Sequence, residues 1–513
     1  MRTIIVFCRK QLIMASSIEL YGQYKNTMQK IADVKYSGAV LQWDQETYIP
    51  KKAGEIRGRQ IATLTEIAHE LFTDEKLGGL LNELAGRDDL SITEKRNVEL
   101  TLEDYNRNKK LSPAFVRAMT EAVNKSFYAW LAARKENRFA VFEHPLDQLI
   151  QFKKQEADLL GYDIHPYNAL MNDYEKGVTV AMVDDIFDKL KPRLKQLLDD
   201  IAGKQQVNDD FLHQHFDKDT QWKLGMEVLK RMQFDFDAGR QDISEHPFTT
   251  SFNNADVRVT TRIDENDFTN MLWSCIHEGG HALYEQGLPA EQYGLPLGEY
   301  CSLGIHESQS RLWENCIGRG LPFWEHNFSM VQAFFPQQLG NFSVAQFYKA
   351  INKVQPSLIR TEADELTYHF HVMIRYELEK LVISGVLATK DIPAYWNEQY
   401  EKYLNVKVPD DKNGCLQDVH WSHGSFGYFA TYSLGSLYAA QFDAAVELQN
   451  RSLEKEIASG NNNTLLEWLR KNIHQYGRQF TSAELCKKAT GENLNADHFI
   501  NYATKKYNTV YNT

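Results

Sequence analysis

The sequence predicts a mainly α-helical protein with one small β-sheet. Helix start signals recur along the chain, and several long segments space their apolar residues along one face of a helix. Alternating β-branched segments, which are typical of strands, are scarce. The 513 residues are 43% hydrophobic and 25% charged, as in globular proteins with a large core. We therefore expect residues 18–513 to form a single helical domain.

Capping boxes mark three predicted helix starts. In this pattern a Ser or Thr side chain and a Glu three residues later bond the free N–H groups of the first turn. The pattern occurs at Ser91, Thr464 and Thr481. After Thr464, apolar residues follow at helical spacing as far as Gly477, which is typical of a helix end. We expect a helix to begin at each of the three capping residues.

Two apolar stripes and one alternating segment complete the predicted elements. Residues 183–202 and 370–386 each carry apolar side chains along one helical face, and we expect a kink at Pro192. Residues 257–262 have the sequence Val-Arg-Val-Thr-Thr-Arg, which alternates and is β-branched. This segment is the predicted strand of the small sheet.

Charge and cysteine content limit the partners and the location. The net charge of −12 argues against nucleic acid or an anionic membrane as a partner. Six cysteines in so long a chain do not form a disulfide framework, so we interpret them as reduced thiols in the cytoplasm. The apolar run near the N-terminus is too short for a secretory signal or a membrane span. Because Met14 would be a natural start, we interpret residues 1–17 as a mis-called or disordered extension.

The most informative motif is the HEGGH sequence at residues 277–281. Two histidines four residues apart lie on one face of a helix, so both imidazoles can reach one tetrahedral metal ion. Glu278 then lies beside the metal, where a general base for a metal-activated water is needed. The flanking residues are apolar, and a buried pair of imidazoles needs partners such as a metal. The motif predicts a zinc peptidase; the simpler alternative is a surface helix with two unrelated histidines.

A catalytic zinc site also needs a third protein ligand and one open position. Tyr284 and Gly287 stand where the HExxHxxGxxH class has glycine and histidine, so that class is excluded. Gly287 and Pro289 should end the metal helix, and a second helix that starts near Glu299 would run back antiparallel. The third ligand is therefore expected on this second helix.

Residues 305–309 of the returning helix would lie level with the two histidines. Glu307 is at the centre of this range and is the predicted third ligand. Judged by its height along the returning helix, Glu299 is too near the turn to reach the metal. Glu285 and Glu314 match the height of the two histidines less well than Glu307 does. The alternative for Glu307 is an ordinary solvated carboxylate on a helix.

Several motifs, taken in order, resemble one known family. From about residue 18 onward the chain is similar to the carboxypeptidase Taq family of metallocarboxypeptidases, and residues 1–17 are the one mismatch. The early segment AVLQWDQET at residues 39–47 also resembles the family's N-terminal helical region. The motifs that carry the resemblance are HPF at 246–248, DVRVT at 256–260, HEGGH at 277–281, HESQ at 306–309, IRTEAD at 359–364 and GCLQDVHW at 414–421.

The resemblance implies a fold, an activity and an assembly. It implies a largely helical fold with a long, deep groove, similar in shape to angiotensin-converting enzyme and neurolysin. It implies release of single residues from the C-termini of peptides, with broad specificity. It also implies a homodimer that holds one zinc ion per chain, with cobalt or manganese as alternatives.

The resemblance also implies roles for individual residues. It places His277, His281 and Glu307 on the metal, with Glu278 as the general base. Tyr428 resembles the tyrosine that stabilises the oxyanion in the converting-enzyme relatives, and Tyr432, one turn later, is the alternative.

A carboxypeptidase must recognise a free α-carboxylate, which suits a guanidinium group. Arg360 of the IRTEAD motif is the candidate, with Gln417 and His420 expected near the same end of the groove. The alternative for Arg360 is an ion pair with Asp364, four residues later. His246 and Arg258 are candidates either for binding the substrate backbone or for bracing the site.

Two further expectations concern the surroundings of the metal. Carboxylates should hold the two histidines, and Glu362 and Asp364 are the candidates. Four cysteines near the motifs lack the CxxC spacing of a thiolate metal site, so we expect buried structural thiols at Cys275, Cys301, Cys316 and Cys415.

Three other classes of function compete with a metallocarboxypeptidase. An endo-oligopeptidase or peptidyl-dipeptidase would share the metal chemistry but would place its carboxylate anchor farther away or lack one. An aminopeptidase is disfavoured because the sequence contains no Gly-x-Met-Glu-Asn motif. An inactive helical scaffold that binds peptides is disfavoured because every catalytic element is intact.

Overall fold

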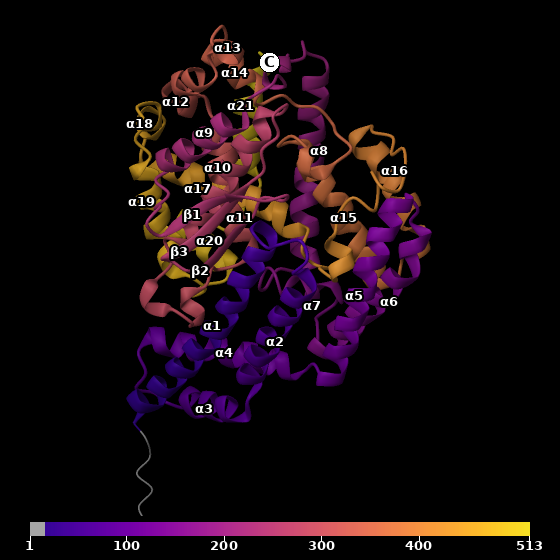
Figure 1. The fold of residues 1–513 in the computed structure, drawn as a ribbon, viewed down its shortest axis with the longest axis vertical. Coiled ribbons are helices and arrows are strands. Elements are labelled where there is room, and N and C mark those ends of the chain that lie inside the picture. Colours follow the sequence, from indigo (N-terminus) through magenta and orange to yellow (C-terminus); the bar gives the residue numbers. More distant parts are fainter. Residues whose placement is uncertain (1–15, 513) are drawn as a thin grey trace, which may run out of the picture.

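Helices dominate the structure, a computed structural model that describes residues 16–512 (Figure 1). The predicted mainly helical class is confirmed, and the small sheet has three strands, two more than the sequence indicated. Three buried apolar clusters hold the helices together. The interpretation of the N-terminal extension concerns residues that lie largely outside the described part.

The first four helices pack around a small apolar cluster of their own. Side chains from α1, α3 and α4 form its centre, and Leu295 from a later loop joins them. The capping box predicted at Ser91 is confirmed, because Ser91 Oγ accepts a hydrogen bond from the N–H of Glu94 at the start of α4. These helices are α1 (Ser17–Thr47), α2 (Gly54–Thr73), α3 (Glu75–Ala85) and α4 (Ile92–Lys109).

A second, larger cluster joins helices from the middle of the chain to helices near its end. The stripe predicted at residues 183–202 lies on α8, which continues through Pro192, and the stripe at 370–386 lies on α15. The helices that contribute most are α5 (Pro113–Glu136), α6 (Ala140–Leu160), α7 (Tyr167–Met171), α8 (Val180–Ala202), α15 (Thr367–Ser384), α16 (Ile392–Leu404) and α21 (Asp497–Tyr511).

The third cluster surrounds the predicted metal helix, α10. The helix that follows, α11, leads directly into a π-helical segment, η4 (Leu312–Gly318). The helices of this part are α9 (Lys218–Arg231), α10 (Phe268–Glu285), α11 (Leu303–Arg311), α12 (Leu321–Phe334), α13 (Pro336–Leu339), α14 (Val344–Ala350), α17 (Ala430–Gln449), α18 (Leu453–Ala458), α19 (Asn463–Asn472) and α20 (Ser482–Thr490). Short 3-10 helices link the elements: η1 (Asp210–Leu212), η2 (Ala290–Gln292), η3 (Pro296–Gly298), η5 (Arg360–Glu362), η6 (Thr389–Asp391), η7 (His420–His423) and η8 (His474–Tyr476).

One of the two remaining predicted capping boxes forms and the other does not. At the start of α20 the Thr481 side chain accepts a hydrogen bond from the N–H of Glu484, as predicted. The prediction at Thr464 is wrong, because α19 already begins at Asn463 and the Thr464 hydroxyl donates to Glu456 instead. The carboxylate of a neighbouring helix therefore takes the hydroxyl that the local pattern assigned to the cap.

The sheet lies beside α10 and has the strand order β1-β3-β2. The central strand, β3 (Asp256–Thr261), covers the predicted segment at 257–262 and is parallel to β1 (Gly239–Ile243). The edge strand, β2 (Thr249–Asn253), is antiparallel to β3, with Thr249 opposite Val259 and an irregularity between Ser251 and Asn253. This edge strand therefore lies close to the predicted metal helix.

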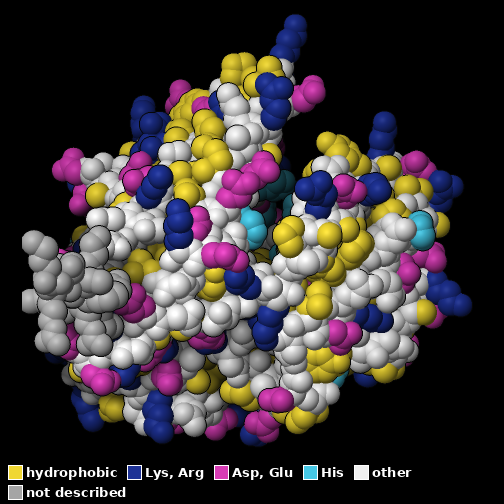
Figure 2. All heavy atoms as spheres, turned by 90° about the horizontal axis from the view of Figure 1, so that it is seen from below, with side chains coloured by type: hydrophobic (Ala, Val, Ile, Leu, Met, Phe, Trp, Pro, Cys, Tyr) yellow, Lys and Arg dark blue, Asp and Glu magenta, His cyan; other side chains and the backbone are white. Residues whose placement is uncertain are grey.

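A groove with a volume of about 1730 Å³ runs past the sheet edge, α10 and α11. Figure 2 shows the surface hollowed near the centre of one face, with histidine side chains at the hollow. The predicted metal helix and the start of α17 both contribute to the groove lining. None of the helices within residues 16–512 is long and apolar enough to cross a membrane.

Candidate active site

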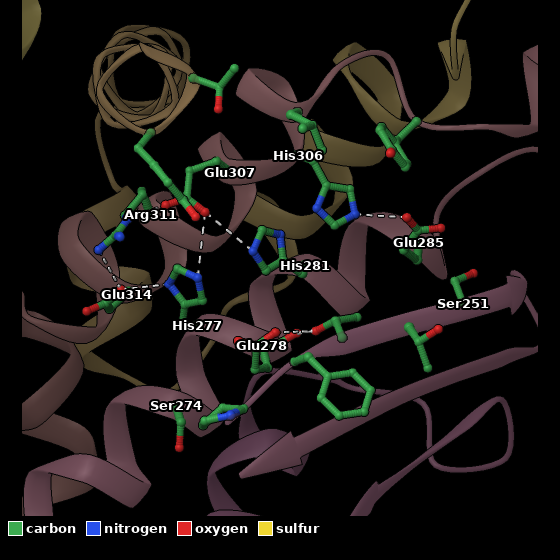
Figure 3. A pocket seen from close by; sticks show the side chains of 18 of the residues that line it. Ser251, Ser274, His277, Glu278, His281, Glu285, His306, Glu307, Arg311 and Glu314 are labelled. Carbon is green, nitrogen blue, oxygen red and sulfur yellow. Dashed lines mark hydrogen bonds and ion pairs between the residues drawn. The ribbon is translucent and has the colours of Figure 1, made fainter. Parts of the chain in front are cut away.

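His277, His281 and Glu307 meet in the groove, as the sequence predicts. Glu307 Oε2 lies 3.6 Å from His277 Nε2 and 3.4 Å from His281 Nε2 (Figure 3). Two ligands at 2.0–2.1 Å from one tetrahedral ion lie about 3.3 Å apart, so these two distances suit a single metal ion. Within residues 16–512, this is the one group of histidine, cysteine and acidic side chains found that could hold a metal ion.

The close approach of α10 and α11 explains why the motif contains Gly280. A Cβ atom at this position would lie 2.7 Å from the carbonyl oxygen of Gln309 and 2.8 Å from Cα of Ser310. Glycine therefore lets the second helix pass close enough to bring Glu307 to the histidines. The returning helix begins at Leu303, a few residues later than expected, but it still brings Glu307 to the two histidines.

Carboxylates and arginines surround the donor set. His277 Nδ1 lies 2.8 Å from Glu314 Oε2, and Arg311 donates to Glu307 Oε1 at 2.7 Å and to Glu314 at 3.2 Å. Burial alone would raise the pKa of Glu307, but Arg311 and His277 outweigh it and hold that pKa well below its usual range. Burial, with help from His306, lowers the pKa of His281 to about 3. The site thus holds an ionised carboxylate beside a neutral imidazole, the forms that bind metals.

The carboxylates that hold the histidines are not the predicted ones. Glu314 bonds His277, whereas Asp364 accepts from the N–H groups of Leu366 and Thr367 at the start of α15. Glu362 lies in η5 and, among the described residues, forms no hydrogen bond or ion pair with either histidine. A signal for Glu314 was present in the sequence, because it lies seven residues after Glu307 and so on the same side of a helix two turns later. The prediction of Glu362 and Asp364 is therefore wrong.

A second histidine–carboxylate pair lies next to the donor set. His306 Nε2 lies 2.8 Å from Glu285 Oε1, and the His306 ring stacks on His281 at a centroid distance of 4.4 Å. Both residues line the groove (Figure 3). The stacked ring fixes the orientation of His281, whose own Nδ1 has no hydrogen-bond partner among the described residues.

Glu278 lies beside the donor set, where the motif places the general base. Its side chain lines the groove but is only 7% exposed, and burial raises the pKa of its carboxyl. The hydroxyl of Thr249 on β2 donates to Glu278 Oε2 at 2.6 Å. Thr249 was not identified from the sequence, because no local pattern links a strand residue to a helix 29 positions later.

Tyr428 and Tyr432 both line the groove, at the start of α17. Tyr428 follows Gly427, which has a φ of +98° and packs so closely on α7 that a Cβ would lie 2.7 Å from the backbone of Leu170. The N–H of Gly427 donates to the buried carboxylate of Glu379 at 2.8 Å. Burial raises the pKa of Tyr428 to about 12, so its hydroxyl keeps its proton at neutral pH. This position suits a hydrogen-bond donor, and the roles of the two tyrosines stay predictions.

Arg360 lines the groove and is paired, but not with Asp364. Its Nε donates to Asp418 Oδ1 at 3.0 Å, a second nitrogen lies 2.9 Å from the same oxygen, and a third donates to Tyr368 at 3.2 Å. The alternative ion pair with Asp364 is therefore not made, because that carboxylate caps α15. Asp418 and Tyr368 therefore hold in place a guanidinium that lines the groove.

Gln417 and His420 lie behind Arg360. Gln417 accepts hydrogen bonds from the Arg360 N–H and from Arg375, and its amide nitrogen donates to two backbone carbonyls. His420 Nε2 lies 3.2 Å from the Tyr432 hydroxyl, and burial lowers the pKa of His420 to about 4. Neither is among the described residues that line the groove, so their contacts support Arg360 and Tyr432, and a direct substrate contact stays a prediction.

His246 and Arg258, which the sequence left open between two roles, have different surroundings. His246 is exposed and lines the groove. Arg258 forks onto Asp256 at 2.8 Å, and its guanidinium lies 4.3 Å above the ring of Trp43 on α1. These contacts make Arg258 a brace between α1 and the sheet, whereas His246 is placed where a substrate could reach it.

The cysteines near the motifs are free thiols, and none of them belongs to the group that could hold the metal. Cys275, Cys301 and Cys415 are buried, Cys316 is partly buried, and burial raises the pKa of each thiol. A thiol with a raised pKa is a poor nucleophile and metal ligand at neutral pH. The prediction of buried thiols is confirmed at Cys275, Cys301 and Cys415, whereas Cys316 is only partly buried.

Comparisons with known proteins agree with the geometry. The family model described as carboxypeptidase Taq (M32) metallopeptidase matches residues 23–507. Carboxypeptidase 1 of Bacillus subtilis (strain 168) is 37% identical over 491 residues, which cover 95% of this chain and 98% of that protein.

Solved structures are similar over almost the whole chain. One, "The Structure of CHT", is 60% identical, with a TM-score of 0.94, and the match covers 95% of this chain and 99% of that one. The M32 carboxypeptidase from Deinococcus radiodurans R1 is 38% identical, with a TM-score of 0.95, over 96% of this chain and 100% of that one.

Proposed function

This chain belongs to the carboxypeptidase Taq (M32) family of metallopeptidases, and we propose from this premise how its groove shortens peptides. It is a metallocarboxypeptidase, a hydrolase that acts on peptide bonds. The observation that carries the mechanism is the meeting of His277, His281 and Glu307 beside Glu278 in the groove. The substrate is a peptide with a free C-terminus, and the product is a single released residue with broad specificity.

His277, His281 and Glu307 would hold one divalent cation. Two imidazoles and one carboxylate suit zinc, with cobalt or manganese as alternatives. When bound, the metal supplies a Lewis acid that activates water and polarises the peptide carbonyl. Arg311 and Glu314 support this donor set, because they keep Glu307 ionised and orient His277 through its Nδ1.

Glu278 acts as the general base. The carboxylate takes a proton from the attacking water and delivers it to the nitrogen of the leaving residue. Its burial supports this role, because a carboxyl with a raised pKa holds the transferred proton more readily than an exposed one.

Tyr428 donates its hydroxyl to the oxygen of the scissile carbonyl as negative charge develops there. A preorganised donor in a buried site stabilises such an oxyanion far better than water does. Tyr432 is the alternative donor, because its ring also lines the groove, 5.1 Å from the ring of Tyr428.

Arg360 anchors the C-terminal carboxylate of the substrate. Its charge is permanent, and Asp418 and Tyr368 hold the guanidinium at the groove wall. His246, which is exposed in the groove lining, contributes to substrate binding, while Gln417, His420 and Arg258 brace their neighbours. A peptidyl-dipeptidase or endo-oligopeptidase is the second candidate function, since it would use the same metal site with its anchor farther away.

The remaining expectations join this proposal as the family resemblance implies them. The chain forms a homodimer and works in the cytoplasm, and its residues 18–513 form one domain. Its groove has the overall shape found in angiotensin-converting enzyme and neurolysin. Sedimentation of the purified protein would measure the assembly directly, and a monomer at all concentrations would contradict the dimer.

Mass spectrometry of a short peptide with and without an amidated C-terminus tests the function. We expect stepwise loss of single C-terminal residues, which amidation and a chelator both abolish. Release of dipeptides would favour the second candidate function. In the same assay Glu278→Gln should keep the metal and lower kcat by at least about a hundredfold, the lower scale of general-base contributions. Wild-type turnover by this variant would remove Glu278 from its role.

A further inference from the structure

Thr249 makes a contact that the mechanism above does not use. Its hydroxyl lies 2.6 Å from Glu278 Oε2 and 3.0 Å from the backbone carbonyl oxygen of the same residue. Figure 3 shows one of these contacts as the dashed line that ends on Glu278. A hydroxyl has one hydrogen to donate. The carboxylate oxygen is the nearer acceptor and, when ionised, the stronger one, so it receives this hydrogen.

The strand that carries Thr249 is held firmly in place at this point. The preceding residue, Phe248, donates its N–H to Thr260 Oγ1 at 2.9 Å and accepts from the Thr260 N–H at 2.9 Å. Thr249 itself lies opposite Val259 on the buried central strand, and β2 and β3 both pack on α10. The position of the Thr249 hydroxyl is therefore set by the sheet and not by the substrate.

The contact leaves one carboxylate oxygen of Glu278 available. Within residues 16–512, Oε1 of Glu278 has no hydrogen-bond partner, although the side chain as a whole is buried and lines the groove. A glutamate has several rotatable bonds, and a general base must present its oxygen within hydrogen-bond reach of the proton that it removes. Fixing one oxygen restricts where the other can lie.

We propose that Thr249 is the positioning residue of the general base, holding Glu278 Oε2 so that Oε1 faces the attacking water. This inference rests on the proposed role of Glu278 but assigns to β2 a part in the chemistry that the metal motif does not contain. Thr249 does not touch the reacting atoms and acts only through Glu278. The alternative is a purely structural link between β2 and α10.

Steady-state kinetics of Thr249 variants on a short N-blocked peptide separate the two. Thr249→Val keeps the shape but removes the hydroxyl, and we expect kcat to fall about tenfold to a hundredfold, the usual cost of losing a partner that orients an active group. KM, metal content and the thermal unfolding midpoint should stay close to the wild type. Thr249→Ser keeps the hydroxyl and should restore most of the turnover.

Thr250→Val is the matched control. It removes a hydroxyl from the next residue of the same strand, and among the described residues that hydroxyl bonds no part of Glu278. We expect its kcat to equal that of the wild type. If Thr249→Val does not fold, Thr249→Ala gives the same comparison without the added branched side chain.

A double-mutant cycle decides whether Thr249 acts through the base. In the Glu278→Gln background, Thr249→Val should have no further effect on kcat. An equal further fall in that background, or a wild-type kcat for Thr249→Val alone, would overturn the inference. A failure of Thr249→Ser to restore turnover would do the same. Wild-type turnover by Glu278→Gln alone would instead overturn the proposed function, so the two failures are distinct.

Discussion

The two walls of the groove are built in different ways. One wall, which we call the helical wall, consists of His277, Glu278, His281 and Glu307 on α10 and α11. The other, the loop wall, consists of Arg360, Tyr428 and Tyr432 from η5 and the start of α17. Regular helix geometry places the first set, whereas buried carboxylates distant in sequence hold the second. The loop wall is therefore the part whose function depends most on remote contacts.

The largest expected effect comes from removing a donor of the helical wall. His281→Ala should lose the metal and lower kcat by at least about a thousandfold, because the metal supplies several kcal/mol of transition-state stabilisation. Metal analysis and peptide hydrolysis measure both results. His215→Ala, which changes an exposed histidine, is the control and should behave as the wild type. Full metal content in His281→Ala would contradict the assignment of this wall.

The next effect tests the loop wall directly. Tyr428→Phe should lower kcat by about a hundredfold or more while KM changes little, since the hydroxyl acts on charge that exists only in the transition state. Steady-state kinetics with Tyr432→Phe as the companion variant measure it. A larger loss in Tyr432→Phe would move the oxyanion role one turn along α17. Equal, small losses would remove both tyrosines from the chemistry.

A smaller effect is expected from changing Glu379, the carboxylate that supports the loop wall. It accepts hydrogen bonds from the N–H of Gly427 and from the indole of Trp421. An amide at this position turns one acceptor into a donor, so Glu379→Gln should lower kcat by about tenfold by displacing Tyr428. The counterpart in the helical wall is Glu314, which bonds His277 from the segment that directly follows α11. Unchanged kinetics would show that Gly427 alone holds the loop.

The same residue predicts a pH dependence of stability. Burial raises the pKa of Glu379 to about 7, although bonds from Tyr167, Gly427 and Trp421 oppose the shift. The folded protein then binds a proton more tightly than the unfolded chain, whose carboxyl has a pKa near 4.5. The free energy of unfolding should therefore fall as the pH rises from about 4.5 to about 7. Denaturant titrations of the wild type and Glu379→Gln measure this, and an equal slope in the two would contradict it.

The smallest effect concerns the brace outside both walls. Arg258→Ala should lower the free energy of unfolding by about 1 kcal/mol, the scale of a cation–π contact such as that with Trp43. KM should stay unchanged, and Arg258→Lys should retain part of the stability. A rise in KM without loss of stability would give Arg258 a role in substrate binding.

The comparison also shows how far the sequence could predict the site. The donor set follows from local spacing, because two turns of helix and a short return fix where Glu307 lies. The partners of those donors do not follow in the same way. Glu314 replaced the expected Glu362 and Asp364, because caps and ion pairs compete for the same carboxylates once the chain folds.

The helices and strands also differ in how far the sequence could predict them. The helix starts at Ser91 and Thr481 depend only on neighbouring residues and were predicted, whereas the start at Thr464 failed because Glu456 took its hydroxyl. Two of the three strands, β1 and β2, lacked an alternating pattern, and pairing with β3 rather than propensity keeps them extended. Thr249 and Glu379 act across long separations in the chain, which no short pattern records.

The π-helical segment after α11 restricts the length of the chain at this place. Within Leu312–Gly318 the hydrogen bonds reach one residue farther than in an α-helix, so the segment holds an additional residue. Loss of that residue would let the segment return to ordinary α-helical winding, and Glu314, which lies within it, would move relative to α11. The carboxylate would then turn away from the imidazole that it supports. The position of Glu314 therefore depends on the length of this segment as well as on its contact with His277.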